Sequence, residues 1–131
     1  MELVKRYVFL IAYMYLIFDT ETTGLPKKWN APITDTDNWP RCVQLAWQLH
    51  DNNGKIISDS SCLIKANDFD IPFESEKIHG ISTELSKQIG LKLDDVLNSF
   101  LSDLNQAKYI IGHNLKFDLN IIRAELYRSK L

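Results

Sequence analysis

The sequence has little of several features that would place a chain outside the ordinary globular class. Its 131 residues include two cysteines, four prolines and five glycines, which are too few for a disulfide framework or a collagen-like chain. Its 15 Lys and Arg nearly balance 17 Asp and Glu, so no strong long-range electrostatic attraction to nucleic acid or anionic lipid is expected. Binding of nucleic acid through a few local contacts is not excluded. Cys42 and Cys62 are predicted to be small buried side chains in a reducing cytoplasm.

A long hydrophobic run is also missing. The longest, residues 8–18, has eleven residues, short of the roughly 20 that a membrane-spanning helix needs. Lys5 and Arg6 precede it, as they would in a signal peptide, but no small-x-small cleavage site follows. We therefore expect no membrane contact and a buried strand here. Residues 1–13 are predicted to be an N-terminal extension, with Met14 as an alternative start, and residues 14–131 to form one domain.

The first half of the chain has the patterns of three strands. The apolar run at 13–19 predicts a central strand covered on both faces. Strict alternation over residues 41–50 predicts a half-buried strand, and Asn53-Gly54 predicts a hairpin turn into a third strand at 55–65. The polar connection at 25–40 is unusually long, and connections of that length are often functional.

The second half has the patterns of helices around one more strand. Short helices are expected at 73–79 and from residue 82 or 83 to about 90. An amphipathic helix follows, with apolar positions at Leu93, Val96, Leu97, Phe100, Leu101 and Leu104. A strand at 109–112 leads to a last helix, capped by Asn114 and ending near Arg128, with Leu115, Leu119, Ile122 and Leu126 facing inward. This order predicts an α/β fold with a mixed sheet and one parallel crossover.

Two carboxylates stand at the end of the first predicted strand. Asp19 and Glu21 are two residues apart, so their side chains point the same way, and ligand sites in α/β sheets collect at the carboxyl ends of strands. Adjacent carboxylates repel each other, and a divalent cation between them would remove that repulsion. The alternative is that the strand simply ends there and both acids are solvated.

A third carboxylate interrupts the last helix. Asp118 lies on the predicted inward stripe, where a lone buried carboxylate costs several kcal/mol unless it is paired or bound to a metal. The alternative is an acidic helix start that complements the helix dipole. Taken together, Asp19, Glu21 and Asp118 suit a hard cation with oxygen ligands.

Several histidines and tryptophans remain ambiguous. His79 and His113 border a helix end and a strand-to-helix turn, where a purely structural role is an alternative to ligand binding, and His50 has no assigned role. Trp29 and Trp39, in the 25–40 connection, can stack on nucleobases. Their alternative role is to pack that connection onto the sheet.

Three short motifs in this order resemble those of a nuclease family. Residues 18–25 (Phe-Asp-Thr-Glu-Thr-Thr-Gly-Leu), 78–81 (Ile-His-Gly-Ile) and 113–118 (His-Asn-x-x-Phe-Asp) are similar to motifs of the DEDD 3′–5′ exonucleases. The similarity is to the DEDDh branch that includes the bacterial DNA polymerase III epsilon proofreading subunit. It covers roughly residues 14–128.

The resemblance implies an RNase H-like fold and stepwise release of nucleotides from a 3′ end by two-metal hydrolysis. It assigns Asp19, Glu21 and Asp118 to two Mg²⁺ or Mn²⁺ ions. It places five more residues at the terminal nucleotide: Thr22, Thr23, Leu25, His79 and Asn114. The partners it implies are single-stranded DNA or DNA 3′ ends, with RNA as another substrate, and a DNA polymerase.

The sequence departs from this family after Asp118. The family's third motif carries a general-base His or Tyr and a fourth Asp on a last helix, and Leu131 comes before any such motif. We therefore expect a C-terminally truncated exonuclease domain that lacks the last strand and helix and has weak or no activity. An open sheet edge would then invite a homodimer.

Two other functions stay open from the sequence. One is a catalytically dead remnant that binds nucleic acid or another protein. The other is an oligoribonuclease-like RNA exonuclease, because such enzymes share these motifs.

Overall fold

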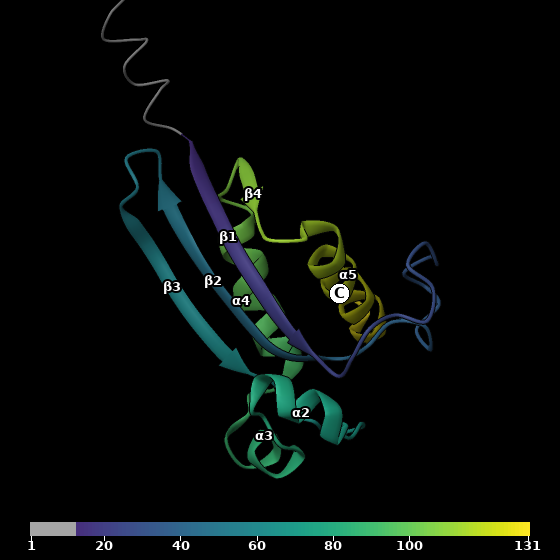
Figure 1. The fold of residues 1–131 in the computed structure, drawn as a ribbon. Helices are drawn as coiled ribbons and strands as arrows, with labels where there is room; N and C mark the ends of the chain where they lie inside the picture. The colour runs from purple at the N-terminus through teal and green to yellow at the C-terminus, as the bar shows by residue number, and fades with distance from the viewer. Residues whose placement is uncertain (1–12) are drawn as a thin grey trace, which may run out of the picture.

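The computed structural model describes residues 13–131 and confirms the α/β fold with a mixed sheet (Figure 1). The elements in chain order are β1 (Met14–Thr22), β2 (Cys42–Asp51), β3 (Ile56–Leu63), α2 (Phe73–His79), α3 (Thr83–Ile89), α4 (Leu93–Leu104), β4 (Tyr109–Ile111) and α5 (Leu115–Ser129). The sheet order is β3-β2-β1-β4. Strand β1 runs antiparallel to β2 and parallel to β4, so the predicted crossover is present.

The described residues leave two predictions about the N-terminus partly untested. Strand β1 begins at Met14, but the proposed extension of residues 1–13 lies almost wholly outside the described range, so it stays a prediction. Within residues 13–131, no helix has both the length and the apolar character needed to cross a bilayer.

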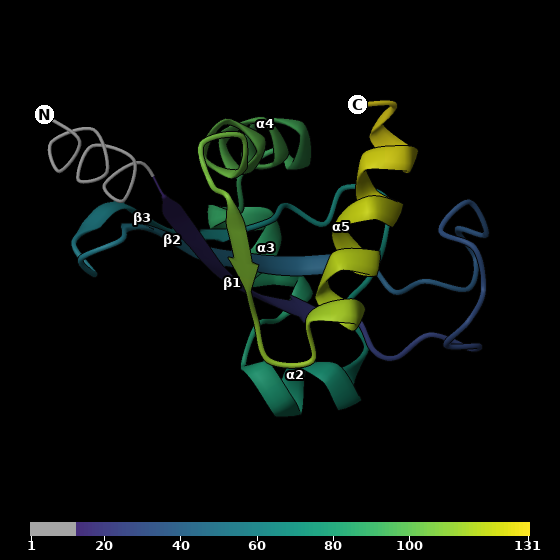
Figure 2. The same cartoon turned by 90° about the horizontal axis from the view of Figure 1, so that it is seen from above.

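The core lies between the sheet and two helices. Figure 2 shows α4 and α5 on the same face of the sheet. Alternate residues of β2 are buried, as predicted: Leu45, Trp47 and Leu49 point into this core, and Val43 packs in a second, smaller cluster with Ile71 and Ile81. From α4, the ring of Phe100 lies 5.3 Å from that of Phe18 and 5.5 Å from that of Trp47. These aromatic contacts fix α4 across the middle of the sheet.

The other face of the sheet is not covered as predicted. Strand β1 was expected to be buried on both sides, yet Ile17 is 40% exposed while Leu16 is fully buried. In Figure 1, the sheet face turned toward the viewer carries no helix of residues 13–131. Because both long helices pack on one side, alternate residues of an apolar run can face outward. Asp19 shares this open side with Ile17.

The buried side of helix α5 extends beyond the predicted stripe. Of the residues expected to face inward, Ile122 is buried, but Leu115, Leu119 and Leu126 are only half-buried. The buried residues of α5 are Asp118, Ile121, Ile122, Ala124 and Glu125. Leu115, Leu119 and Leu126 nevertheless pack against the core, as predicted. The buried stripe extends beyond them to Glu125, an acid that an apolar pattern does not count.

Two smaller predictions need similar corrections. Asn114 precedes α5 in a left-handed conformation (φ 53°, ψ 49°) and its side chain makes no capping hydrogen bond. Ser82, by contrast, caps α3 by accepting a hydrogen bond from the Leu85 N–H.

Cys42 and Cys62 are both free, but only Cys42 is buried. Burial raises the pKa of the Cys42 thiol well above its usual value.

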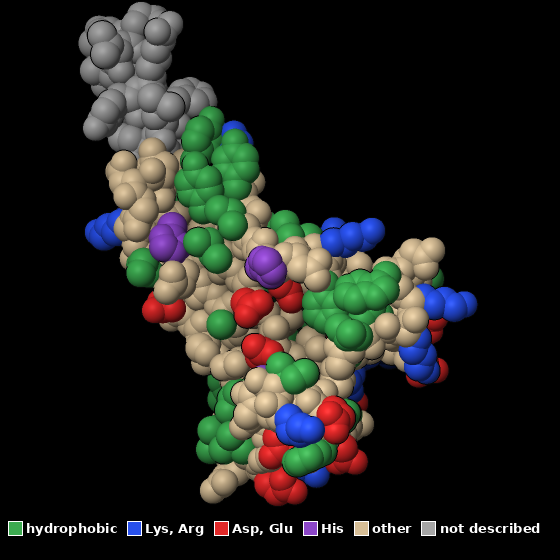
Figure 3. All heavy atoms as spheres, viewed as in Figure 1, with side chains coloured by type: hydrophobic (Ala, Val, Ile, Leu, Met, Phe, Trp, Pro, Cys, Tyr) green, Lys and Arg blue, Asp and Glu red, His purple; other side chains and the backbone are tan. Residues whose placement is uncertain are grey.

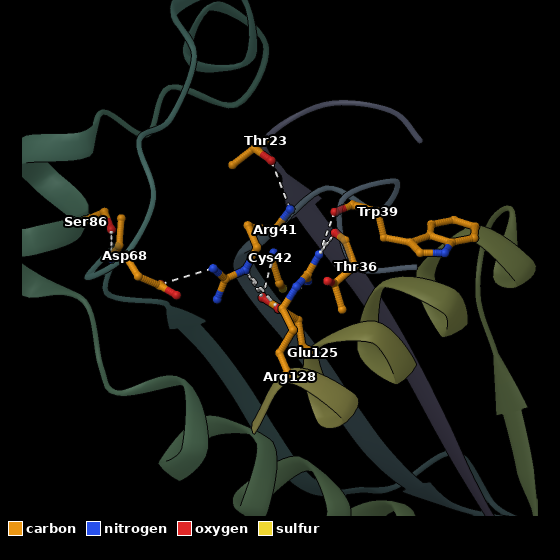
Figure 4. Close-up of polar contacts among 10 residues, drawn as sticks. Thr23, Thr36, Trp39, Arg41, Cys42, Asp68, Ser86, Glu125 and Arg128 are labelled. Carbon is orange, nitrogen blue, oxygen red and sulfur yellow. Dashed lines mark hydrogen bonds and ion pairs between the residues drawn. The ribbon is translucent and has the colours of Figure 1, made fainter. Parts of the chain in front are cut away.

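The side chain of Glu125 joins α5 to the start of β2 (Figure 4). It is fully buried and accepts hydrogen bonds from Arg41 Nε at 3.0 Å, Arg128 Nη1 at 2.6 Å and the Cys42 N–H at 3.1 Å. Two guanidinium groups therefore compensate one carboxylate. Such a buried charge is tolerated only when it is paired and fully hydrogen-bonded.

The two arginines extend this contact to the connection at 25–40 and to the exit of β1. Arg128 Nη2 donates to the carbonyl oxygens of Thr36 and Trp39, each at 2.7 Å. The Arg41 N–H donates to Thr23 Oγ1 at 2.9 Å, and the Thr23 N–H donates to the Arg41 carbonyl at 3.0 Å. The Glu125 carboxylate thus holds the backbone that follows β1 through one intermediate residue.

Replacing Glu125 by Ala is predicted to lower the free energy of unfolding by about 3–5 kcal/mol, because the Arg128 guanidinium and the Cys42 N–H lose their acceptor and the Arg41 guanidinium keeps, among the described residues, only the exposed Asp68 as a carboxylate partner. The control is Glu74→Ala, which removes an exposed carboxylate 3.5 Å from Lys77 and should cost less than about 1 kcal/mol. Urea unfolding followed by circular dichroism measures both. Equal losses in the two variants would contradict the structural role given to Glu125.

Candidate active site

The exit of β1 is a turn held in place by its own side chains and by α2. Thr22 Oγ1 donates to the Gly24 carbonyl at 2.7 Å, and Gly24 takes a φ of 153° that favours glycine. Ser75 Oγ, from α2, donates to the Thr23 carbonyl at 2.7 Å. The turn is therefore fixed without using either carboxylate of β1.

The three predicted acids lie near this turn. Asp118 is buried and accepts a hydrogen bond of 2.5 Å from Thr20 Oγ1, a residue 98 positions away in sequence. Asp19 is exposed and Glu21 is half-buried. Neither of these two side chains makes a hydrogen bond or ion pair with a residue in the range 13–131. Figure 3 shows acidic side chains gathered on this face of the molecule.

The pKa of Asp118 is raised in the folded chain. Burial is the largest cause of its raised pKa, and the Thr20 hydroxyl opposes it by stabilising the ionised form. The negative charges of Asp19 and Glu21 raise this pKa further. The structure thus brings together the three acids that the sequence singled out, in an arrangement where their charges repel.

The chemistry of these side chains suits a hard divalent cation, which prefers carboxylate oxygens. A cation would also remove the repulsion among them. Among residues 13–131, however, no group of three or more His, Cys, Asp or Glu side chains is already arranged to hold a metal ion. The donor set therefore fits such an ion in type and charge, without forming a closed coordination shell.

A pocket of about 280 Å³ adjoins the acids. Its lining residues come from the exit of β1, from α2 and from the first turn of α5, and they are Thr20, Glu21, Thr22, Gly24, Leu25, Ser75, Ile78, His79 and Phe117. Leu25 and Ile78 are 72% and 84% exposed, so the pocket has an apolar rim, and Glu21 is the acid that lines it. This shape and lining can hold one sugar and base with its phosphate toward the acids.

His79 lines this pocket, but both of its ring nitrogens contact backbone. Nδ1 accepts a hydrogen bond from the Ile81 N–H at 3.1 Å, which leaves Nε2 to donate to the Thr22 carbonyl, also at 3.1 Å. This assignment of the tautomer follows from the two partners. His79 therefore joins the end of α2 to the exit of β1, and what it presents to the pocket is its ring.

Two other predicted residues lie apart from this pocket. Thr23 lines a neighbouring hollow with Lys27, Arg41 and Arg128, and its hydroxyl is occupied by the Arg41 N–H. Asn114 is exposed at the turn before α5 and does not line the pocket. His113, beside it, lines a third hollow together with Asp19 on the open face of the sheet.

Sequence analysis gave no role to several residues that shape the site. Thr20 supports Asp118, Ser75 holds the turn, and Phe117 lines the pocket. A signal existed for Thr20, because a residue between Asp19 and Glu21 on a strand must face the core, toward the last helix. For Ser75, no pattern in the sequence indicated its partner.

The chain is similar in sequence to a subunit of bacterial DNA polymerases. DNA polymerase III subunit epsilon of Rickettsia conorii is 30% identical over 112 residues, which are 85% of this chain and 43% of that protein. The subunit of Rickettsia typhi is 33% identical over 111 residues, with the same shares. The chain thus spans less than half the length of the curated relatives that it matches.

Solved structures show the same fold. E. coli exonuclease I in complex with a dT13 oligonucleotide matches with a TM-score of 0.71 at 23% identity, over 89% of this chain and 24% of that one. Exonuclease I of Methylocaldum szegediense matches with a TM-score of 0.72 at 24% identity, over the same shares. The predicted RNase H-like architecture is confirmed. A family model described as Exonuclease (RNase T) matches residues 16–130, and the chain therefore belongs to this exonuclease family.

Proposed function

We propose that this domain hydrolyses phosphodiester bonds at the 3′ ends of nucleic acids, as a nuclease of the DNA proofreading or repair type. The observation that carries the proposal is the group of Asp19, Glu21 and Asp118 beside a pocket of nucleotide size. Three carboxylates repel a phosphodiester, so a substrate binds here only if cations lie between them. We propose Mg²⁺ or Mn²⁺ as those cations.

Each group would then have a distinct task. Two bound cations supply stabilisation of the attacking and leaving oxygens. Asp19, Glu21 and Asp118 would hold them, and the Thr20 hydroxyl orients Asp118 and favours its ionised form. Thr22, Leu25 and the ring of His79 would position the terminal nucleotide. We further propose that Thr23 and Asn114 contact it from outside the pocket.

We also propose that the 131-residue chain has weak activity by itself. After Asp118 its sequence has no His or Tyr followed by a suitable Asp, so it supplies neither a fourth acid nor a general base of the expected kind. General-base catalysis alone contributes about 10²–10⁴-fold to a rate. This is also why a role in binding nucleic acid without cleaving it is retained as a second candidate.

Partners and location are proposed from the relatives. Because these are subunits of DNA polymerase III, we propose that the domain works beside a DNA polymerase, in the cytoplasm. The homodimer predicted through the open edge of the sheet has no support from the comparisons and stays a prediction. The edge in question is β4, whose Tyr109 and Ile111 are exposed.

Replacing Asp118 by Asn is predicted to stabilise the metal-free chain at neutral pH. Asn keeps an acceptor for the Thr20 hydroxyl but removes the buried charge, and a gain of roughly 0.5–2 kcal/mol is usual for a stabilising substitution. The pKa of Asp118 is raised in the folded state. The wild-type chain therefore loses stability as the pH rises from about 4, the pKa of Asp in the unfolded chain, through the higher pKa of Asp118 in the folded chain. The Asp118→Asn variant should lack this loss. Urea unfolding in EDTA across that pH range measures it.

The same variant should lose metal binding. Mn²⁺ is predicted to raise the Tm of the wild-type chain, since a ligand that binds only the folded state stabilises it, and to leave the Tm of Asp118→Asn unchanged. Glu84→Gln removes an exposed first-turn acid from another helix and serves as the control. An equal Mn²⁺ response in wild type and Asp118→Asn would refute the proposed ligand.

Nuclease activity is the direct test of the reaction. With Mn²⁺ and 5′-labelled single-stranded DNA, the chain is predicted to give slow, stepwise loss from the 3′ end, and Asp19→Ala should abolish it. Binding without loss would instead favour the second candidate function. Turnover of di- to pentaribonucleotides but not of DNA would identify an oligoribonuclease-like enzyme.

A further inference from the structure

The two tryptophans of the 25–40 connection have opposite environments. Trp39 is 3% exposed and its indole N–H donates to the Pro32 carbonyl at 3.0 Å, so it anchors the connection to the protein. Trp29 is 52% exposed, and its only described side-chain contact is with a ring. The packing role considered for both residues therefore accounts for Trp39 and leaves Trp29 unexplained.

The ring that Trp29 contacts belongs to the candidate active site. The ring centroids of Trp29 and Phe117 are 5.6 Å apart, at an angle of 51°. Phe117 lines the nucleotide-sized pocket and precedes Asp118. The surface therefore runs from the acids through the pocket and Phe117 to an exposed indole. In Figure 3, a hydrophobic patch on this face lies directly beside the acidic side chains.

The backbone next to Trp29 is held rigidly. Asn38 is 5% exposed and its side chain bonds the Lys28 backbone twice, accepting from its N–H at 2.7 Å and donating to its carbonyl at 3.0 Å. The Lys27 N–H also donates to the Asn38 carbonyl at 3.2 Å. An exposed indole on a fixed backbone loses little conformational freedom when a ligand stacks on it.

The charges around the indole suit a polyanion. Lys27 and Lys28 directly precede Trp29 in sequence, Lys116 directly precedes Phe117, and all three are exposed. Figure 3 shows Lys and Arg side chains along the outer side of the hydrophobic patch, with the acids on its inner side. Exposed aromatic rings with cations beside them are the usual surface for single-stranded nucleic acid.

We propose that Trp29 is a stacking platform for one base of a single-stranded nucleic acid. This base belongs to the nucleotide next to the 3′-terminal nucleotide, which occupies the pocket. The strand would run from the pocket across Phe117 onto the indole, with its backbone toward the lysines. A paired base cannot offer its face in this way, so the platform selects single-stranded over base-paired 3′ ends. This inference rests on the proposed function for the position of the 3′ end.

The test measures the affinity of the chain for oligothymidylate with a 5′-fluorescein label, by fluorescence anisotropy and with Ca²⁺ as the divalent cation. Trp29→Ala is expected to weaken binding by about 5- to 140-fold, the loss that corresponds to one base stacked on an aromatic ring. Trp29→Phe should recover most of the affinity, because it keeps an aromatic face. Tyr127→Ala is the matched control: Tyr127 lies on α5 and is also 52% exposed, but it is about 15 Å along the helix from Phe117.

Intrinsic fluorescence supplies a second readout. The other two tryptophans, Trp39 and Trp47, are each 3% exposed, so quenching by the unlabelled oligonucleotide should come from Trp29 and vanish in Trp29→Phe while binding persists. An oligonucleotide with an abasic site next to its 3′ nucleotide should bind wild type and Trp29→Ala equally.

The outcomes separate this inference from the proposed function. Wild-type affinity in Trp29→Ala, or an equal loss in Tyr127→Ala, would overturn the platform, as would failure of the wild-type chain to bind the oligonucleotide. The proposed metal site would be judged independently, by the Mn²⁺ response of Asp118→Asn.

Discussion

The compensated burial of Glu125 is the interaction on which most of the site's framework depends. One carboxylate, inaccessible to water, accepts from Arg41, Arg128 and the Cys42 N–H. Those three donors come from the start of β2 and the end of α5, and the arginines hold the backbone at 23, 36 and 39 in turn. Removing the acid would leave Arg128 without a carboxylate partner among residues 13–131 and Arg41 with the exposed Asp68 alone, so the end of α5, the long connection and the exit of β1 are energetically coupled.

Two turns earlier on the same helix, Asp118 is buried under opposite conditions. Its partner is a neutral hydroxyl from Thr20. Burial is the largest cause of its raised pKa, and the charged groups Asp19 and Glu21 raise that pKa further. A fold that supplies two guanidinium groups to Glu125 has the means to neutralise a buried acid. Because uncompensated charge of this kind collects at functional sites, Asp118 fits the proposal that the missing positive charge comes from a bound cation.

Much of this could be read from the sequence, and the failures have physical causes. Alternation in β2 and the spacing of apolar residues in α4 placed those elements correctly, because each pattern reports a local period. The burial of Asp118 also followed from its position on the helix. The burial of Glu125 did not follow, since its partner Arg41 lies 84 positions away and an apolar pattern counts such an acid as outward-facing. Nor did composition distinguish Trp29 from Trp39, whose difference in exposure depends on how the whole connection folds back.

The described contacts also explain why the acids stay available to a ligand. The turn after β1 is fixed by Thr22 and Ser75, the end of α2 by His79, and the connection by Asn38. Each of these bonds uses a hydroxyl, an imidazole or an amide, and each closes onto backbone. Asp19 and Glu21 take no part in them, so their oxygens keep full capacity to bind while the frame around them is already rigid. In a site arranged in this way, the entropy cost of ordering the side chains and the backbone is met during folding. Binding of a ligand then needs little further ordering of the protein.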